Sequence, residues 1–506
     1  MPDNYLKMIL NSRVYDVAHK TPLDFARNLS QRLGNDIWLK REDLQPVFSF
    51  KLRGAYNKIA SLDESVCKNG IITASAGNHA QGVALAARHC KLKALIVMPR
   101  TTPGIKVKAV QALGGKALLH GDTYDEAYAH AEHLAAERGL AFIHPYDDPE
   151  VIAGQGTVAM ELLQQHRDDL HAVFVPVGGG GLITGIATYI KYLRPEIRVI
   201  GVEPDDAPCM YEALKRKRRV VLDQVGIFAD GVAVRQVGKE TYRLARKYVD
   251  EVMLVGTDEI CAATKDIFDD TRAMVEPAGA LAVAAIKKYV EREGIEGERM
   301  VAINSGANIN FDRLRHVAER AELGERREAL LAVTIPERPG SFLRFCRTLG
   351  KRGITEFNYR YADAGEAHVF AGVQLSKGDE ERRGLLDRLR GENYPVVDMT
   401  DNEMAKSHIR FMVGGRAHSL EDEVLYRFEF PERPGALLKF LSSIGKRWNI
   451  SLFHYRNHGA AYGRVLVGIQ VPGSDRRHFR KFLDELGYTW FEELENPAYS
   501  LFLGNG

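Results

Sequence analysis

Short apolar runs alternate with helical stretches from the start of the chain to about residue 320. The length of these runs and their content of Val and Ile predict buried strands. They lie at residues 37–39, 71–73, 94–98, 173–177 and 199–202. Between the runs, residues 80–89 and 123–138 have apolar positions at helical spacing, which predicts helices.

Repeated strand–helix units predict an α/β fold with open, largely parallel twisted sheets and helices on both faces. We place the first domain, which includes these units, at residues 1–325. Sheets of this kind bind ligands at the carboxyl ends of their strands. The loops that follow the strands are therefore the first places to look for chemistry.

From about residue 328 the chain contains two copies of one unit. The sequence PERPG at residues 336–340 recurs at residues 431–435, and GKR at residues 350–352 recurs at residues 445–447. Each copy reads as a strand, a Pro-Gly turn, a helix and two more strands, a pattern typical of a small α+β sandwich.

We therefore predict two further domains, at residues 328–400 and 423–500, with a polar, glycine-containing connector at about residues 398–419.

Composition narrows the class of protein. A chain of 506 residues is too long to fold around one hydrophobic core, so several domains are expected. The net charge of +2 does not favour binding to nucleic acid or to an anionic membrane. The basic run at residues 215–219 is better explained as a solvated helix end or loop than as a nucleic-acid patch. No stretch has the ~20 apolar residues of a membrane helix. Five dispersed cysteines without a Cys-x-x-Cys pair predict a cytoplasmic protein with no disulfide framework and no metal site.

Three loops are candidates for chemistry. Lys51 lies in the sequence SFKLRG, although a lysine there could also be a solvated helix residue. Asn78 lies in the loop at residues 75–79, before a helix predicted from Ala80, where free backbone N–H groups could bind an anion, unless Asn78 only caps the helix. Four glycines at residues 178–181 precede another helix, and a plain turn would not need all four. They favour phosphate binding, but without the signatures of nucleoside triphosphate or dinucleotide loops.

Taken together, these motifs resemble the biosynthetic threonine deaminases of the fold-type-II pyridoxal-phosphate family. The resemblance rests on the order and spacing of seven motifs along nearly the whole chain. They are KRED at residues 40–43, SFKLRG at 49–54, TASAGNHAQG at 73–82, GGGG at 178–181, DGVA at 230–233, EPAGA at 276–280 and SGAN at 305–308.

The resemblance implies a role for each matching residue. Lys51 would form an imine with pyridoxal 5'-phosphate and remove the α-proton of the substrate, L-threonine or L-serine. Phe50 would pack on the cofactor, Asn78 would bind its 3-oxygen, and Ser305 would face its ring nitrogen. The phosphate would be bound by Gly178, Gly179, Gly180, Gly181 and Leu182. The substrate carboxylate would be bound by the loop of Ser75, Ala76, Gly77, Asn78 and His79.

The tail resembles the paired ACT-like domains of the same family, which implies inhibition by isoleucine, antagonism by valine and a homotetramer. Apolar residues early in the two predicted helices are candidates to line the effector pockets, or simply core. These are Phe342, Leu343, Phe345, Leu437, Leu438 and Leu441. The tail could alternatively serve oligomerisation alone.

Several other activities remain open on this fold. Rival enzymes are a cysteine or cystathionine synthase, a threonine synthase and a serine-specific dehydratase, and the doubled tail argues against all of them. A non-catalytic amino-acid sensor is disfavoured by the intact Lys51, Asn78 and Ser305. Serine racemases, which resemble the first domain, carry a second serine where this chain has Ala76, so we expect little racemisation.

Overall fold

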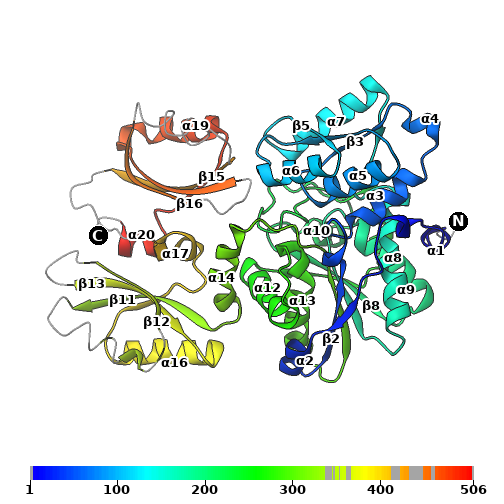
Figure 1. Ribbon diagram of the computed structural model, residues 1–506. Helices are drawn as coiled ribbons and strands as arrows, with labels where there is room; N and C mark the ends of the chain where they lie inside the picture. Colours follow the sequence, from blue (N-terminus) through cyan, green and yellow to red (C-terminus); the bar gives the residue numbers. More distant parts are fainter. Residues whose placement is uncertain are drawn as a thin grey trace. The chain divides into compact units, whose positions relative to one another are not determined.

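The computed structural model (Figure 1) describes residues 4–336, 345, 348–350, 352, 354–360, 366–411, 422–431, 448–456 and 462–503. The chain divides into two compact units, Met1–Ala321 and Glu322–Gly506. None of the described helices combines the length and apolar composition that a membrane crossing needs.

The first unit contains two sheets. The larger has the order β1-β2-β10-β7-β8-β9, and all neighbouring strands are parallel except β1 and β2. The smaller has the order β5-β4-β3-β6 and is parallel throughout. The strands of the larger sheet are β1 (Leu23–Phe25), β2 (Asp36–Arg41), β7 (Ala172–Pro176), β8 (Arg198–Pro204), β9 (Glu251–Val255) and β10 (Arg299–Asn304). Those of the smaller are β3 (Ile71–Ala74), β4 (Ala94–Met98), β5 (Lys116–Leu119) and β6 (Ala141–Phe142).

Helices pack on both faces of the larger sheet (Figure 1). Along β7, Phe174 faces a core formed with α12 and α13, whereas Val173 and Val175 face a core formed with α8 and α9. This central strand is therefore apolar on both faces, as a parallel sheet covered by helices on both sides requires. The predicted class of open, largely parallel α/β sheets is confirmed.

The helices of this unit begin and end at recognisable signals. For example, Thr123 and Glu126 form a capping box before α7, and Gly139 ends that helix with φ +61°. The helices are α1 (Tyr5–Leu10), α2 (Arg27–Leu33), α3 (Lys51–Ala60), α4 (Glu64–Cys67), α5 (Asn78–His89), α6 (Gly104–Ala112), α7 (Tyr124–Arg138), α8 (Pro149–Gln165), α9 (Gly181–Leu193), α10 (Cys209–Lys215), α11 (Lys239–Tyr248), α12 (Thr257–Thr271), α13 (Pro277–Glu293) and α14 (Arg313–Gly324).

Glycines allow α8 to approach two other helices at backbone distance. A Cβ at Gly154 of α8 would lie 2.8 Å from the Cα of Gly54 in α3. A Cβ at Gly185 of α9 would lie 2.7 Å from the backbone nitrogen of Gly156 in α8. Real Cβ atoms do not approach so closely, so α3, α8 and α9 are held together where only hydrogen atoms fit.

The second unit contains two antiparallel four-stranded sheets of identical order, β12-β13-β11-β14 and β16-β17-β15-β18. The first comprises β11 (Glu328–Pro336), β12 (Ile354–Arg360), β13 (Glu366–Gln374) and β14 (Val396–Asp398), with α16 (Gly378–Gly391) packed on one face. The second comprises β15 (Glu423–Pro431), β16 (Asn449–Arg456), β17 (Tyr462–Gln470) and β18 (Thr489–Glu492), with α19 (Arg476–Leu486). The predicted pair of α+β sandwiches is confirmed.

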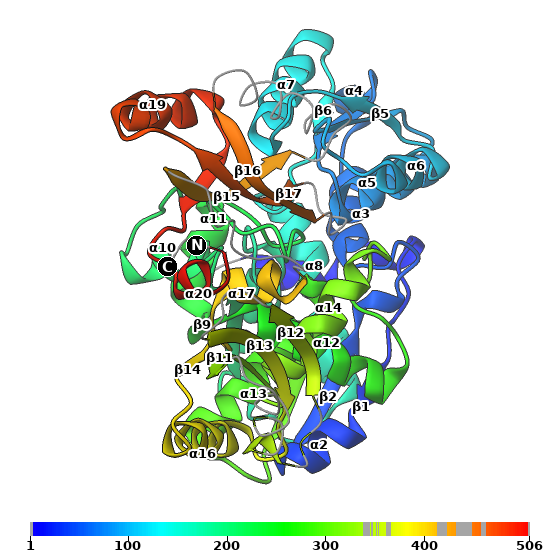
Figure 2. The ribbon, with the colours of Figure 1, turned by 90° about the vertical axis from the view of Figure 1, so that its left-hand side faces the viewer.

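The faces of the two sheets that α16 and α19 leave uncovered contribute to one shared core. Leu330 of β11, Phe370 of β13, Leu425 of β15 and Leu466 of β17 all belong to it. The short helices α17 (Glu403–Ser407) and α20 (Pro497–Phe502) lie between the sheets (Figure 2). Part of the predicted connector is thus packed structure.

One of the six candidate effector residues, Phe345, lies within the described residues. Phe345 is buried in the core of the first sandwich. The other five candidates, Phe342, Leu343, Leu437, Leu438 and Leu441, lie outside the described residues.

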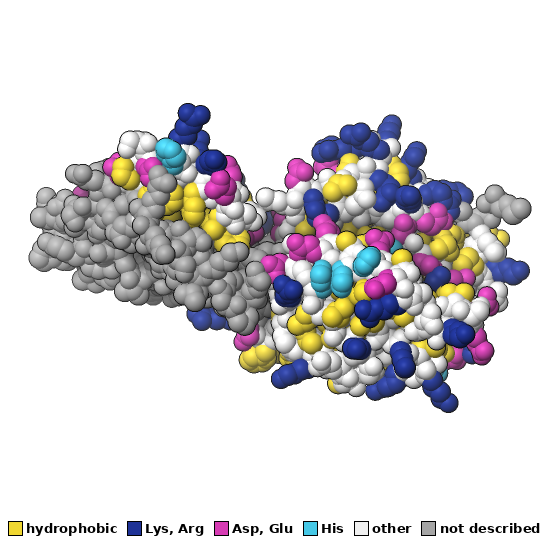
Figure 3. All heavy atoms as spheres, turned by 90° about the horizontal axis from the view of Figure 1, so that it is seen from above, with side chains coloured by type: hydrophobic (Ala, Val, Ile, Leu, Met, Phe, Trp, Pro, Cys, Tyr) yellow, Lys and Arg dark blue, Asp and Glu magenta, His cyan; other side chains and the backbone are white. Residues whose placement is uncertain are grey.

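Charges of both signs are mixed over the described surface seen in Figure 3. The basic run begins at the last residue of α10. Within it, Arg216 pairs with Glu212 at 2.8 Å and Arg219 donates to the carbonyl oxygen of Val237 at 2.9 Å. These contacts agree with the interpretation of the run as a helix end.

Candidate active site

Lys51 is the first residue of α3, and the segment before it is paired with the loop after β10. The Phe50 N–H donates to the Ser305 carbonyl oxygen at 3.2 Å, and Ser49 forms an isolated bridge with Gly306. Because β2 and β10 are parallel neighbours, their carboxyl ends deliver both segments to the same edge of the sheet. Lys51 and Ser305 are thus brought together.

The Lys51 amine lies in a largely dehydrated position. Its Nζ atom donates to the Pro145 carbonyl oxygen at 3.1 Å and lies 5.4 Å from the centre of the Phe50 ring. Burial lowers the pKa of Lys51 to about 8, although the nearby Glu276 carboxyl opposes this shift. A larger fraction of this amine is therefore neutral, and hence nucleophilic, near neutral pH than of an ordinary lysine.

Residues 145 and 146 connect the lysine to the glycine loop. Pro145 accepts the hydrogen bond from Lys51, and the ring of the next residue, Tyr146, covers Gly179. A Cβ at Gly179 would lie 2.2 Å from the Tyr146 ring, so no larger residue fits there. Gly180 has φ +98°, a conformation that favours glycine.

The glycine loop offers backbone groups at the start of a helix. It follows β7, and α9 begins at Gly181, whereas the sequence predicted a start at Leu182. Leu182 is buried in the core beneath. The first N–H groups of a helix have no partner within it, so this loop presents donors and a positive helix dipole to an anion.

The other side of the site is closed by residues 231 and 232. A Cβ at Gly178 would lie 3.0 Å from the Cα of Val232, and a Cβ at Gly231 would lie 3.9 Å from the Nδ2 atom of Asn78. Contacts therefore run from Lys51 through Tyr146 to the glycine loop, and from that loop to Asn78.

Asn78 does not cap α5. The helix begins at Asn78 itself, after Gly77, rather than at Ala80 as predicted. The Asn78 Nδ2 atom donates to Glu276 Oε1 at 2.6 Å, and its Oδ1 atom accepts from Asn308 Nδ2, also at 2.6 Å. The alternative that Asn78 is an ordinary cap is therefore wrong.

The other residues of the loop at 75–79 differ in what they contribute: Gly77 makes a backbone contact, whereas His79 has a buried side chain. The Gly77 N–H donates to Ser75 Oγ at 3.3 Å, and Ala76 is half-buried beside the core of the smaller sheet. The His79 ring is buried with Nε2 at 3.1 Å from the Ile143 carbonyl oxygen, and burial lowers the His79 pKa to about 3. His79 thus lies there as a neutral ring.

Ser305 follows β10 directly and is buried. Its Oγ atom lies 3.4 Å from the carbonyl oxygen of Ala278, in the first turn of α13. The side chain therefore places a neutral hydroxyl group at the carboxyl end of β10.

Three groups in the site had no predicted role: Glu276, Asn308 and Asp230. Each lies in a motif recognised in the sequence, but the motif does not reveal its contacts. Asp230 pairs with Lys106 at 2.6 Å and with Arg313 at 3.2 Å, and these two cations hold the pKa of its carboxyl well below the usual range despite burial. In the sequence, only their position within the motifs EPAGA, SGAN and DGVA indicated that these three residues belong to the site.

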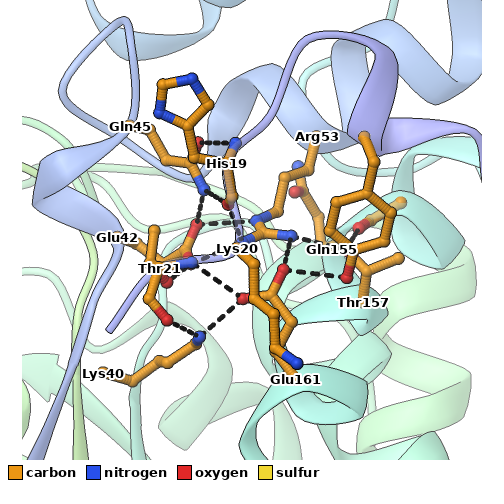
Figure 4. Close-up of polar contacts among 12 residues, drawn as sticks. His19, Lys20, Thr21, Lys40, Glu42, Gln45, Arg53, Gln155, Thr157 and Glu161 are labelled. Carbon is orange, nitrogen blue, oxygen red and sulfur yellow. Dashed lines mark hydrogen bonds and ion pairs between the residues drawn. The ribbon is translucent and has the colours of Figure 1, made fainter. Parts of the chain in front are cut away.

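A buried network of charges holds the start of α3 (Figure 4). The Arg53 side chain donates from Nε and Nη2 to Glu42, at 2.7 and 2.8 Å. Its Nη1 atom donates to Glu161 at 2.7 Å and to Thr157 at 3.1 Å, and Nη2 also donates to the His19 carbonyl oxygen at 3.2 Å. These side chains come from α3, α8 and the segment after β2.

Lys40 completes the network from β2. Its amine donates to Glu161 at 2.6 Å, to the Thr21 carbonyl oxygen at 2.8 Å and to Gln165 at 3.0 Å. The side chains of Lys40, Arg53, Glu42 and Glu161 are all 0% exposed. Two positive and two negative charges therefore balance each other out of contact with water. The motifs KRED and SFKLRG therefore meet in space, two residues from Lys51.

Comparison with known proteins agrees with this geometry. A family model for pyridoxal-phosphate dependent enzymes matches residues 14–306, and one for the C-terminal regulatory domain of threonine dehydratase matches residues 319–409 and 414–503. The chain is 58% identical to the biosynthetic L-threonine dehydratase IlvA of Burkholderia multivorans over 99% of both chains. It belongs to the family of biosynthetic threonine dehydratases.

Other members and neighbours extend this result. The biosynthetic L-threonine dehydratase IlvA of Escherichia coli is 55% identical over 99% of this chain and 97% of its own. The processed form of threonine deaminase isoform 2 from Solanum lycopersicum has a TM-score of 0.62 and 51% identity over 63% of this chain and 88% of its own. Serine racemase from Dictyostelium discoideum has a TM-score of 0.56 and 33% identity over 60% of this chain and 99% of its own.

Threonine dehydratases of this family use pyridoxal phosphate, and the residues present fit that cofactor. Its aldehyde needs an amine, which Lys51 supplies with a lowered pKa. Its phosphate needs donors without side chains in the way, and the backbone N–H groups of Gly178–Gly181 at the start of α9 would supply them. The predicted cofactor is confirmed, whereas the role of each residue remains a prediction.

The buried network yields a prediction about folding. We expect Arg53→Leu to lower the free energy of unfolding by about 3–5 kcal/mol, because Glu42 and Glu161 would stay buried without their partner. Denaturant unfolding of the purified protein measures this change. The control is Arg13→Leu, which removes an ion pair with Asp16 between two much more exposed side chains. Equal small changes in both variants would contradict the argument.

The amine environment predicts the pH dependence of cofactor uptake. Because the neutral amine attacks the aldehyde, the rate at which apoprotein takes up pyridoxal phosphate should rise as pH passes through about 8, and then level off. An amine with an ordinary lysine pKa would keep gaining rate up to about pH 10. Stopped-flow absorbance at a series of pH values distinguishes the two profiles.

Proposed function

We propose that this chain converts L-threonine to 2-oxobutanoate and ammonia, as the first step of isoleucine biosynthesis, with pyridoxal phosphate bound at Lys51. The observation that carries the proposal is the convergence of Lys51, Asn78, Ser305 and the glycine loop in a chain that matches biosynthetic threonine dehydratases along its whole length. L-serine, which has the same leaving group on its β-carbon, is the expected second substrate.

Each part of the site has a task in this reaction. Bound pyridoxal phosphate supplies the electron sink that stabilises negative charge at the substrate α-carbon. The backbone of Gly178–Gly181 and the start of α9 bind the phosphate, with Leu182 packed below. Residues 75–79, at the start of α5, bind the substrate carboxylate in the same way. Phe50 packs beside the Lys51 amine.

Lys51 is the group that moves the proton. Once the substrate has displaced it, its amine lies in a dry site with a lowered pKa, which suits removal of the α-proton. The neutral Ser305 hydroxyl does not force a proton onto the ring nitrogen, which favours elimination over transamination. Ala76 carries no acidic group to protonate the opposite face, so racemisation of serine should be slow.

We also propose that the tail regulates the enzyme. Two copies of one sandwich share a core, so a ligand that alters their packing can bias the whole second unit. Isoleucine as inhibitor, valine as antagonist and assembly into a cytoplasmic homotetramer are the specific parts of this proposal. We place the functional domains at residues 1–325, 328–400 and 423–500.

The catalytic proposal is tested with Lys51→Ala. Losing nucleophile and base together should reduce 2-oxobutanoate formation from threonine by several powers of ten, on the order of 10⁴-fold or more. The matched control is Lys58→Ala, which removes another lysine of α3, partly buried and paired with Asp148 at 2.8 Å. Borohydride reduction and peptide mapping should place the label on Lys51; a label on any other lysine would exclude this assignment.

The regulatory proposal is tested by truncation after Leu323, close to the boundary between the two compact units. We expect a soluble enzyme that still forms 2-oxobutanoate but no longer responds to isoleucine. Effector coupling of this kind usually changes affinity about 5- to 150-fold, so its loss is easily measured. A truncated enzyme inhibited as strongly as the full chain would place the effector site in the first unit.

A further inference from the structure

Glu276 stands where a helix cap is expected but does not act as one. It precedes α13, and its side chain makes no capping hydrogen bond to that helix. The carboxyl group instead accepts from Asn78 Nδ2 at 2.6 Å, while its backbone N–H donates to the Gly306 carbonyl oxygen at 3.1 Å. Glu276 is thus tied to two of the site loops.

Two glycines make room for this carboxyl group. A Cβ at Gly306 would lie 2.7 Å from Glu276 Oε1, and a Cβ at Gly231 would lie 3.2 Å from the same atom. Side chains at either position would press on the carboxyl oxygen that accepts from Asn78. The surroundings therefore preserve one particular placement of that oxygen.

The contact determines which way the Asn78 amide faces. Glu276 Oε1 accepts from its nitrogen, and Asn308 Nδ2 donates to its oxygen, while the same Asn308 nitrogen donates to the Val47 carbonyl oxygen at 2.8 Å. A reversed amide would set oxygen against oxygen and nitrogen against nitrogen. The second hydrogen of Asn78 Nδ2 is consequently presented as a donor.

The charges facing Glu276 come from four elements. Burial, reinforced by Asp230, raises the pKa of Glu276 to about 7, whereas the hydrogen bond from Asn78, Lys106 of α6 and Arg313 of α14 lower it. Lys51 of α3 also senses the carboxyl group, which raises the pKa of its amine. Both protonation states of Glu276 are therefore accessible near neutral pH.

We propose that Glu276 is a positioning residue that fixes the Asn78 amide as a donor to the 3-oxygen of pyridoxal phosphate, and that gain or loss of its proton tunes this hydrogen bond. The inference rests on the proposed function, in which Lys51 and Asn78 bind the cofactor. It assigns a task to a carboxyl group that the reaction otherwise leaves unused.

The test compares Glu276→Gln and Glu276→Ala in the full-length holoenzyme. The control is Glu328→Gln, which changes another buried carboxylate, paired with Arg410 at 2.7 Å in the second unit. Three quantities are measured: the ratio of the two absorption bands of the lysine-bound cofactor from pH 6 to pH 9, the dissociation constant for pyridoxal phosphate, and kcat and KM for threonine.

The wild-type band ratio should change over this pH range as Glu276, whose pKa burial raises, gains or loses its proton. Glu276→Gln keeps an oxygen for Asn78 but has no proton to lose, so this step should disappear while the cofactor remains bound. Glu276→Ala should weaken cofactor binding and lower kcat, each roughly 10- to 100-fold, because the Asn78 amide loses its acceptor. Glu328→Gln should leave spectrum and kinetics unchanged.

Variants of Glu276 that lose only thermal stability, with wild-type spectra and pH dependence, would overturn the inference and leave a structural carboxyl group. This result differs from a failure of the proposed function. If the proposed function were wrong, the wild-type protein itself would not form 2-oxobutanoate from threonine or would not hold pyridoxal phosphate on Lys51.

Discussion

The pairing of Arg53 with Glu42 and Glu161 constrains everything else in the first unit. A guanidinium group without access to water must have its charge balanced and its donors satisfied. Here one carboxylate from each of two other segments balances the charge, and Thr157 and the His19 carbonyl oxygen accept further hydrogen bonds from Arg53. Burial disfavours the charge on Arg53, but the two carboxylates outweigh it and raise its pKa. Chain segments distant in sequence are therefore obliged to meet beside Lys51.

The site itself is a closed set of contacts between loops of both sheets. Lys51 touches the segment at Pro145, the following Tyr146 covers Gly179, and Val232 lies against Gly178. Neither sheet could form this enclosure alone, because Asn78 begins the helix after β3 of the smaller sheet and Ser305 directly follows β10 of the larger. The relative placement of the two sheets therefore determines how the loops of the candidate site are positioned.

The sequence predicts the class of fold well because the runs at residues 173–177 and 199–202 are apolar at successive positions, as strands of a parallel sheet covered on both faces are, and they alternate with predicted helices. The same property hides which strands pair, so the division into two sheets could not be read from the pattern. Lys51, Asn78 and the glycine loop were found through motifs. Glu276 and Asn308 were not assigned a role, because hydrogen-bond partners 198 and 230 residues from Asn78 leave no local signal.

The glycine contacts of α8 fix how closely it packs against α3 and α9. On one side it meets α3, whose first residue is Lys51, and on the other it meets α9, whose first residue closes the glycine loop. Where α8 crosses α3 and α9, the spacing between these helices is therefore set by backbone contact. A single methyl group at Gly154 would meet the backbone of Arg53 and Gly54 and push α3 away from α8, and this would change the spacing between Lys51 and the glycine loop.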